Sequence, residues 1–492
     1  MRRPMPIFYS ALMLTGVNLL LRFTSTAFQV FLSGRLGAAG IGLLQLVLSV
    51  GGLSMTAGIA GIRTATMYLT AEELGRGSPH NIRSVLSGAI LYSILCSGAV
   101  AALLYGFAPV IAERWIGDIC TVPAIRLLAA FLPVSCFTAV MSGYFIAAGR
   151  VGILAAVEVA EQLFSMAVTA LALIIWAGND PGRACQAVVL GSCAGSMLTL
   201  SCLIILRLRE RAPLVQPIPI ARRLAETAVP LAVADDLKAG ISTAENLMVP
   251  KRLALYTTGS LALFGTVCGM VFPILMFPAA ILFGLTELLI PEMARCNAAG
   301  SKRRIHYLMK RSLRLTLLYG TLCSGILFLA APELCSGLYR NLAAGQYLRW
   351  FAPLAVMLYC DIITDAMIKG LGQQKVSVRY NILTSAMDVA LLFLLLPKFG
   401  IKGYFFSFLV THAINFFLSL RRLLKITGRS LNLSTALLTL GCGALSVWLC
   451  AGISGPILRC VSFTAVLISA LVLLGVLRKE DLRWLMGLVY KK

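Results

Sequence analysis

The sequence predicts an all-α polytopic membrane protein of about fourteen transmembrane helices. Hydrophobic residues make up 59% of its 492 residues and charged residues only 13%, a balance typical of membrane proteins. Apolar runs of about 20 residues, the length that spans a hydrocarbon core of ~30 Å, recur along nearly the whole chain. We therefore expect no separate soluble domain.

The apolar segments alternate with short loops that contain most of the charge. The segments are residues 7–33, 41–66, 83–108, 122–148, 151–178, 184–206, 224–250, 259–290, 312–331, 348–369, 376–396, 400–421, 433–453 and 456–477. With both termini in the cytoplasm, most of the 43 basic residues fall in loops on the inner side, as the positive-inside rule requires. Topology thus explains the net charge of +23. Because a nucleic-acid surface needs a solvated basic domain, we expect no nucleic-acid partner.

A faint internal repeat predicts two lobes. A helix with polar residues at the same three offsets begins after each of two turns: Gly149-Arg150, followed by Glu158, Gln162 and Ser165, and Gly372-Gln373, followed by Asn381, Ser385 and Asp388. A parallel repeat of this kind is typical of transporters. It predicts an N-terminal lobe at 1–206, a cytoplasmic linker at 207–223 and a C-terminal lobe at 224–423. Two peripheral helices and a basic cytoplasmic tail then occupy 424–492.

Polar residues on the first and seventh predicted helices indicate a central cavity. A charge at bilayer depth costs ~2.5–3.5 kcal/mol on the insertion scale, so such groups should face protein or water. Helical spacing aligns one set on the first helix, Asn18, Arg22, Ser25 and Gln29, and a second set on the seventh, Asp235, Lys238, Ser242, Glu245 and Asn246. The residues expected to contact a substrate are Arg22, Arg63, Lys238, Asn18, Gln29 and Asn246.

Local pairing is an alternative explanation for several of these charges. Lys238 lies one turn after Asp235, so the two can neutralise each other. Asp236 points about 100° away and needs another partner, for which Arg22 and Arg63 are candidates. The residues expected to form a coupling or structural polar network are Asp235, Asp236, Glu245, Glu158, Glu161, Asp361, Asp365, Lys369 and Asp388. Of these, the charges at 158–161 and 361–369 are expected to be struts between the lobes. Asp365 and Lys369 have the spacing of a structural ion pair.

Motifs for covalent chemistry or metal binding are not found in the sequence. There is no HExxH, no GxxxxGK[ST], no CxxC and no paired His/Cys cluster. We therefore expect no enzyme activity, no cofactor and no metal. The basic stretch at 302–314, with Tyr307 and Leu308 among its charges, is expected to be a membrane-surface helix near anionic headgroups, although topology alone also explains its charge.

Five stretches resemble the oligosaccharide flippases, in particular the group typified by stage V sporulation protein B. They are residues 115–150, 158–164, 245–294, 367–382 and 403–423. This group belongs to the multidrug/oligosaccharidyl-lipid/polysaccharide exporter superfamily. The resemblance implies a two-lobed, fourteen-helix flippase in the bacterial cytoplasmic membrane. Its substrates would be undecaprenyl-linked sugars, in sporulating bacteria the precursors of spore-cortex peptidoglycan, and its partners that lipid, the surrounding membrane lipids and a coupling ion.

The resemblance also implies how the substrate pyrophosphate is held. In related lipid II flippases, basic residues of the first, second and eighth helices have this role. Arg22 matches the position in the first helix. Arg63 occupies a position where many relatives have proline, and the eighth segment, 259–290, has no basic residue. Lys238 is expected to substitute in part, although it lacks the bidentate fork of arginine.

Two other functions are compatible with the composition. The first is a cation-coupled multidrug or metabolite exporter of the same superfamily, which the acids of 225–252 favour and the lack of an acid in the first helix disfavours. The second is a non-transporting membrane scaffold, which the intramembrane charges disfavour because a scaffold does not need them. The sequence has no ATP-binding motif, so an ion, potential or substrate gradient is expected to supply the energy.

Overall fold

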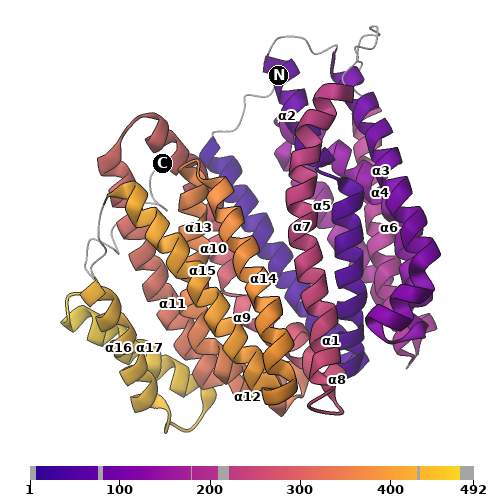
Figure 1. The fold of residues 1–492 in the computed structure, drawn as a ribbon. Coiled ribbons are helices and arrows are strands. Elements are labelled where there is room, and N and C mark those ends of the chain that lie inside the picture. Colours follow the sequence, from indigo (N-terminus) through magenta and orange to yellow (C-terminus); the bar gives the residue numbers. More distant parts are fainter. Residues whose placement is uncertain (1–6, 76–80, 179, 209–220, 429–432, 477–492) are drawn as a thin grey trace. The chain divides into compact units, whose positions relative to one another are not determined.

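The computed structural model describes residues 7–75, 81–178, 180–208, 221–428 and 433–476 (Figure 1). In this part of the chain all regular structure is helical. The α-helices are α1 (Ile7–Ile59), α2 (Ile62–Gly75), α3 (Ile82–Val110), α4 (Val122–Ala147), α5 (Val151–Ala172), α6 (Pro181–Leu208), α7 (Ala221–Leu253), α8 (Ser260–Thr266), α9 (Phe272–Met276), α10 (Ala279–Ala298), α11 (Lys302–Tyr339), α12 (Leu342–Phe351), α13 (Ala355–Gly370), α14 (Gln374–Phe399), α15 (Ile401–Thr427), α16 (Leu433–Cys450) and α17 (Pro456–Leu473).

The predicted multi-pass membrane fold is confirmed. Among the described residues, ten helices are long and apolar enough to cross a membrane, or eleven if the bent pair 260–276 and 279–298 forms one span. Each of the fourteen predicted segments lies on a helical stretch. The first two are joined within α1 across Gly37, where the backbone leaves helical geometry (φ 67°, ψ 179°). Of the other segments, α7 carries many polar residues and α16 is a shorter apolar helix.

By its contacts the described chain forms two compact units. The first contains residues 1–265 and 389–400, and the second contains 266–388 and 401–492. Helix α7 therefore groups with the first unit in this structure, where it packs on α1, α2 and α3. The lobe boundaries expected from the repeat differ from these units and stay a prediction.

The first unit is a bundle in which α4 has a central place. This helix packs on α2, α3 and α6, while α5 packs on α6, and Figure 1 shows α3, α4 and α6 running side by side. A buried cluster joins α2, α3, α4, α6 and the first turns of α7, through residues that include Ile62, Val85, Phe145, Leu203 and Leu224. This core fixes the start of α2 and the start of α7 in the same unit.

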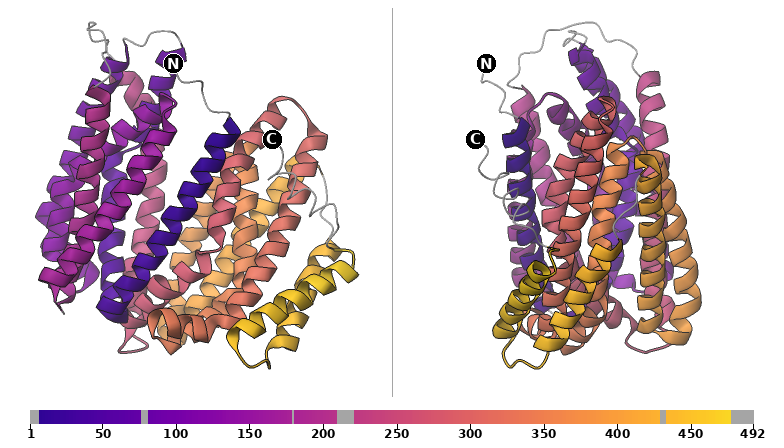
Figure 2. Two further views of the ribbon diagram at one scale, coloured as in Figure 1. Left: turned by 180° about the vertical axis from the view of Figure 1, so that it is seen from behind. Right: turned by 90° about the vertical axis from the view of Figure 1, so that its left-hand side faces the viewer.

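The second unit is built around α11 and α13. Tyr359 of α13 is fully buried, and its hydroxyl donates to the carbonyl of Leu275 at 2.6 Å. Helices α16 and α17 pack on α11, as both views of Figure 2 show. Phe463 of α17 is completely buried against α11 in this contact. The two C-terminal helices are thus attached to the second unit through a single neighbouring helix for most of their contacts.

The two turns that define the sequence repeat have the same backbone structure. Gly149 and Gly372 have φ values of 72° and 77°, a left-handed conformation that glycine adopts without steric cost. In each turn the glycine N–H donates three residues back at 3.0 Å, to Ile146 in one and Lys369 in the other. The polar residues after these turns therefore start from equivalent positions on α5 and α14.

The basic stretch 302–314 does not form a separate surface helix. It is the beginning of α11, a continuous helix of 38 residues. Its buried side, which includes Ile305 and Met309, packs against the protein. The expectation of a helix lying along the membrane is therefore wrong: tertiary packing extends the following transmembrane helix instead.

The close contact between α11 and α17 gives a test of the fold. A Cβ atom at Gly325 would lie 2.1 Å from Phe463 Cζ, whereas one at Gly337 of the same helix would meet nothing within 4 Å. Gly325→Val should lower the free energy of unfolding by about 1–3 kcal/mol through overpacking. Thermal unfolding in detergent measures this effect against Gly337→Val, which makes the same change of helix propensity. Equal midpoints for the two variants would contradict the packing described.

Candidate functional site

A polar cavity of about 480 Å³ lies in the first unit between the ends of α1 and α2 and the middle of α7. Residues 56–64 and 235–242 supply its wall: Thr56, Ile59, Gly61, Arg63, Thr64, Asp235, Lys238, Ala239 and Ser242. The volume falls within the ~300–1,000 Å³ of typical small-molecule sites. Two cationic side chains and one carboxylate line it, so it suits a charged ligand.

A break in the backbone places Arg63 at this cavity. Ala60 and Gly61 both have positive φ, 43° and 71°, and they separate α1 from α2. Positive φ is strained for alanine, and the carbonyl of Ala60 accepts a hydrogen bond from the Tyr92 hydroxyl at 3.3 Å. Because Ile62 is fully buried, the next residue, Arg63, is turned outward at the start of α2.

Arg63 has one carboxylate partner, on α5. Its guanidinium lies 3.7 Å from Glu158, and both side chains are about half exposed, at 50% and 41%. An exposed pair of this kind is weak, about 0–1 kcal/mol. An anion in the cavity can therefore compete with Glu158 for Arg63.

Helix α7 provides the opposite wall. Asp235, Lys238 and Ser242 recur at intervals of three and four residues, and all three line the cavity. The pairing considered for Asp235 and Lys238 is not formed among the described residues, although the two are one turn apart. The Oδ1 atom of Asp236 is buried and has no hydrogen-bond partner in the described structure, so neither arginine considered for it supplies one.

The other residues predicted to contact a substrate lie elsewhere on α1 and α7. Asn246 donates to the Ser49 hydroxyl at 3.0 Å, and Thr243 donates to the Ser49 carbonyl at 3.1 Å, so this part of α7 is tied to α1. Arg22, Gln29 and Glu245 are partly buried and are not among the residues of the cavity wall. The side chain of Asn18 lies outside the described structure.

Polar residues of α5 connect helices of the predicted N-terminal lobe. Gln162 donates to Ser25 Oγ at 2.6 Å and to the carbonyl of Leu21 at 3.1 Å. Glu161 accepts from the Thr199 hydroxyl at 2.7 Å. Every one of these partners lies within 1–206, so these hydrogen bonds are internal to the predicted N-terminal lobe, and the expected link between the lobes stays a prediction. Helix spacing predicts which face is polar, but it does not identify the neighbour.

A second polar network lies in the second unit. Asn415 donates to Asp361 at 2.9 Å, and Asp388 accepts from Ser407 and Thr411 at 2.5 and 3.1 Å. The expected ion pair of Asp365 and Lys369 is present, at 2.6 Å. All of these partners lie within the predicted C-terminal lobe, and the expected link between the lobes stays a prediction for these residues as well. In the described chain, no group of three or more His, Cys, Asp or Glu side chains is placed to hold a metal ion.

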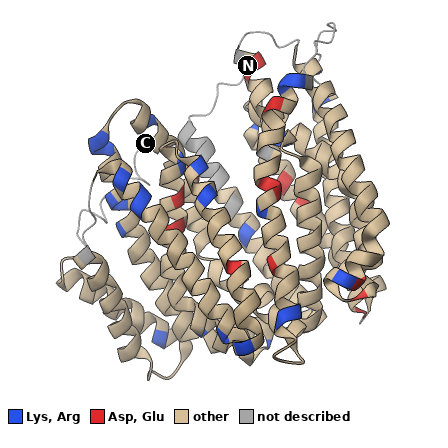
Figure 3. Ribbon diagram, in the orientation of Figure 1, with Lys and Arg blue, Asp and Glu red and all other residues tan. Residues whose placement is uncertain are grey.

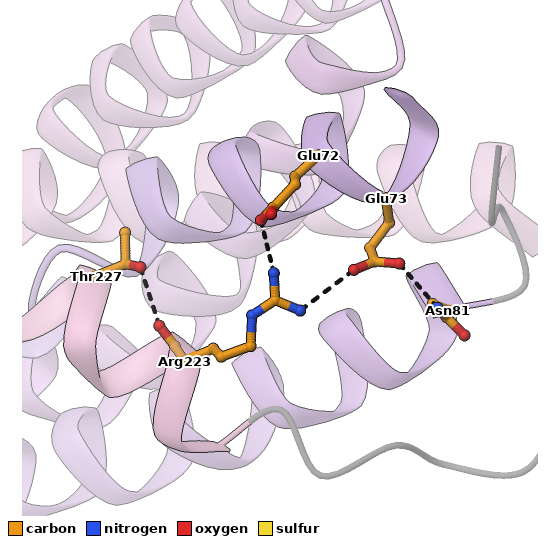
Figure 4. Close-up of polar contacts among 5 residues, drawn as sticks. All are labelled: Glu72, Glu73, Asn81, Arg223 and Thr227. Carbon is orange, nitrogen blue, oxygen red and sulfur yellow. Dashed lines mark hydrogen bonds and ion pairs between the residues drawn. The ribbon is translucent and has the colours of Figure 1, made fainter. Parts of the chain in front are cut away.

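Arg223 ties the beginning of α7 to the end of α2 (Figure 4). Its guanidinium lies 2.7 Å from Glu72 and 3.4 Å from Glu73. Glu73 has a side-chain exposure of only 5%, and it also accepts a hydrogen bond from Asn81 at 2.8 Å. From the sequence alone, Arg223 is one of the basic residues that indicate the cytoplasmic side of the membrane. The acidic pair that follows Thr70 and Ala71, at the inner end of a predicted span, is the signal that could have identified its partner.

Comparison with known proteins supports the predicted family. Residues 15–172 match the MatE family model. Over 406 residues the chain is 22% identical to stage V sporulation protein B of Bacillus subtilis strain 168, covering 80% of this chain and 78% of that protein. The predicted resemblance is confirmed.

Solved structures of a flippase and of a multidrug transporter share the fold. The lipid II flippase MurJ, in an inward closed conformation, matches with a TM-score of 0.69 at 10% identity, over 94% of this chain and 97% of its own. An inward-facing multidrug resistance MATE family transporter of the MOP superfamily matches with a TM-score of 0.66 at 14% identity, over 85% of this chain and 99% of its own. These proteins are described as a flippase and a transporter, not as enzymes.

The interaction of Arg223 with two carboxylates gives a test of how α7 is anchored. Arg223→Ala removes the guanidinium 3.4 Å from the buried Glu73 carboxylate, which should lower the free energy of unfolding by about 1–3 kcal/mol. Arg222→Ala is the matched control, because Arg222 is 91% exposed and pairs only with Glu226 of its own helix. Thermal unfolding in detergent should show a lower midpoint for Arg223→Ala and almost no change for Arg222→Ala. A similar midpoint for both would exclude an anchoring role.

Proposed function

We propose that this protein is a flippase that translocates undecaprenyl-linked oligosaccharide or peptidoglycan precursors across the bacterial cytoplasmic membrane by alternating access. The observation that carries the proposal is the cavity of about 480 Å³ lined by Arg63 and Lys238. The similarity to stage V sporulation protein B and to the fold of a lipid II flippase supports the same substrate class. By the same similarity, we assign the protein to spore-cortex synthesis, with both termini in the cytoplasm.

In this proposal the two cations bind the pyrophosphate of the lipid-linked sugar. Arg63 offers a planar fork that binds two phosphate oxygens, and Lys238 offers a compact point charge. The sugar occupies the remaining polar space beside Thr56, Thr64 and Ser242, while the prenyl chain stays in the surrounding lipid. Arg22 contributes positive potential from α1. Such groups act strongly because the membrane interior has a low dielectric constant.

In this proposal Asp235 couples substrate binding to the uptake of a cation. A carboxylate in the same wall as Lys238 repels a pyrophosphate, so substrate binding requires Asp235 to be neutralised. A proton or another cation that enters with the substrate has this effect. The energy of transport would then come from an ion gradient.

A cation-coupled drug exporter is the second candidate. The match to multidrug transporters and the buried carboxylates of the second unit, Asp361 and Asp388, favour it. The two candidates differ in the sign of the charge that the cavity should attract. A protein that exports cationic drugs from vesicles and leaves lipid-linked sugars in place would be an exporter.

Neutralising the cavity cations tests the flippase proposal directly. Arg63→Gln and Lys238→Gln should each slow translocation of a fluorescent undecaprenyl-pyrophosphate sugar in proteoliposomes by about tenfold or more, because each removes a charge-assisted contact of ~1.5–3 kcal/mol. Lys398→Gln removes an exposed charge at the end of α14 and serves as control. Full activity in both cavity variants, or in Arg22→Ala for the role of α1, would contradict the assignment.

Removing the carboxylate partner of Arg63 should have the opposite effect on affinity. Glu158→Gln eliminates the negative charge 3.7 Å from the guanidinium, so a pyrophosphate no longer competes for Arg63. We expect affinity for the lipid-linked pyrophosphate to rise about two- to fivefold, the range of a weak exposed pair. Equilibrium binding in detergent measures it, with Glu226→Gln as a control for the change of net charge. An unchanged Kd would show that Glu158 does not limit access to Arg63.

A further inference from the structure

The first three turns of α11 extend beyond the apolar part of that helix. Its uncharged run, Leu315 to Pro332, is about 27 Å long at 1.5 Å per residue, which matches a hydrocarbon core of ~30 Å. Lys310 and Arg311 then lie about 5–6 Å outside the core, within a headgroup layer that is ~5–8 Å thick. Tyr307 lies about 10–12 Å outside the core, on the water side of that layer. Lys310 and Arg311 are thus at the depth of lipid phosphates.

One side of this extension is exposed and cationic. Arg303, Tyr307 and Lys310 recur at intervals of four and three residues, and all three are exposed. Ile305 and Met309 are buried on the opposite side. Among the described residues, neither Arg303 nor Lys310 forms an ion pair. The surface therefore presents cations that the described protein does not neutralise.

Neighbouring contacts hold this surface in a fixed place. Arg304 pairs with Glu292 at 2.6 Å, and the Thr427 hydroxyl at the end of α15 contacts Met309 Sδ at 3.4 Å. Arg311 donates to the Tyr307 hydroxyl at 3.1 Å and lies 5.7 Å from the centre of its ring. The half-exposed Tyr307 ring is thereby held against Arg311.

The surrounding charge is also of one sign. Residues 302–314 and 416–427 contain no acidic residue, and Arg421 and Lys425 at the end of α15 are exposed as well. Figure 3 shows the Lys and Arg segments gathered over the first turns of α11. The acid in contact with this region, Glu292, is already engaged by Arg304 and by Arg295. The patch therefore complements a negatively charged partner.

We propose that Lys310, Arg311, Tyr307 and Arg303 form a binding site for the headgroup of an anionic phospholipid. The depth of Lys310 and Arg311 selects a lipid phosphate over a free phosphate, because these two cations face the headgroup layer rather than bulk water. Each basic residue near a membrane surface strengthens such binding roughly fivefold. Lys310 contributes more of the binding free energy than Arg303, since Arg303 lies seven residues, or about two turns, farther from the hydrocarbon core. By the predicted topology this lipid belongs to the cytoplasmic leaflet.

Native mass spectrometry of the full chain, with phosphatidylglycerol or phosphatidylcholine added in detergent, tests the site. The wild-type protein should retain phosphatidylglycerol in preference to phosphatidylcholine. Lys310→Gln should weaken phosphatidylglycerol binding about fivefold, and Arg303→Gln/Lys310→Gln more than tenfold. The conservative variant Lys310→Arg should keep the binding. Arg183→Gln/Arg222→Gln, which removes two exposed and locally paired charges, is the matched control.

Three outcomes would overturn the proposal. They are equal retention of the two lipids by the wild-type protein, unchanged phosphatidylglycerol binding in Lys310→Gln, and an equal loss in the control pair. Displacement of the lipid by millimolar inorganic phosphate would assign the site to a free anion instead. If the double variant fails to fold, the single variants Lys310→Gln and Lys310→Arg still test whether the charge at position 310 binds phosphatidylglycerol. They differ in charge at that position only.

Discussion

The cost of placing a charge where water cannot reach it governs the polar structure of this protein. A membrane span satisfies its backbone within the helix, but a charged side chain needs a partner or a wet cavity. The described structure uses both solutions. Glu161 is hydrogen-bonded to Thr199, while Asp235 and Lys238 face open space in a cavity. The first solution buries the charge, and the second leaves it accessible to a ligand.

The helical part of this fold could be predicted from the sequence because apolar length and loop charge are local properties. Each predicted span lies on a helix, and the intervals along α7 correctly group Asp235, Lys238 and Ser242 on one side. The repeat of turns at Gly149 and Gly372 was also visible, since their conformation depends on glycine. These features need no knowledge of which helices are neighbours.

The candidate site could be predicted only in part, because its geometry depends on contacts between distant segments. Asn246 has the spacing of a cavity residue, yet Ser49 of α1 occupies its amide. Arg63 reaches the cavity through the irregular backbone at Ala60 and Gly61, which no periodicity indicates. In the sequence, Arg223 is one of several basic residues that indicate topology, whereas in the structure it binds two carboxylates, Glu72 and Glu73. Helical periodicity thus identifies the polar face of a helix, but tertiary packing determines its contacts.

The short helix α2 has a mechanical consequence for the cavity. Its 14 residues form a rod about 20 Å long, separated from α1 by the joint at Ala60 and Gly61. Arg63 stands on the first turn of this rod, and Glu72 and Glu73 stand near its other end, where Arg223 holds them. Because Ile62, Ala65 and Leu69 bury this helix in the core of the first unit, α2 keeps Arg63 in the cavity wall and the contact with Arg223 at a fixed separation.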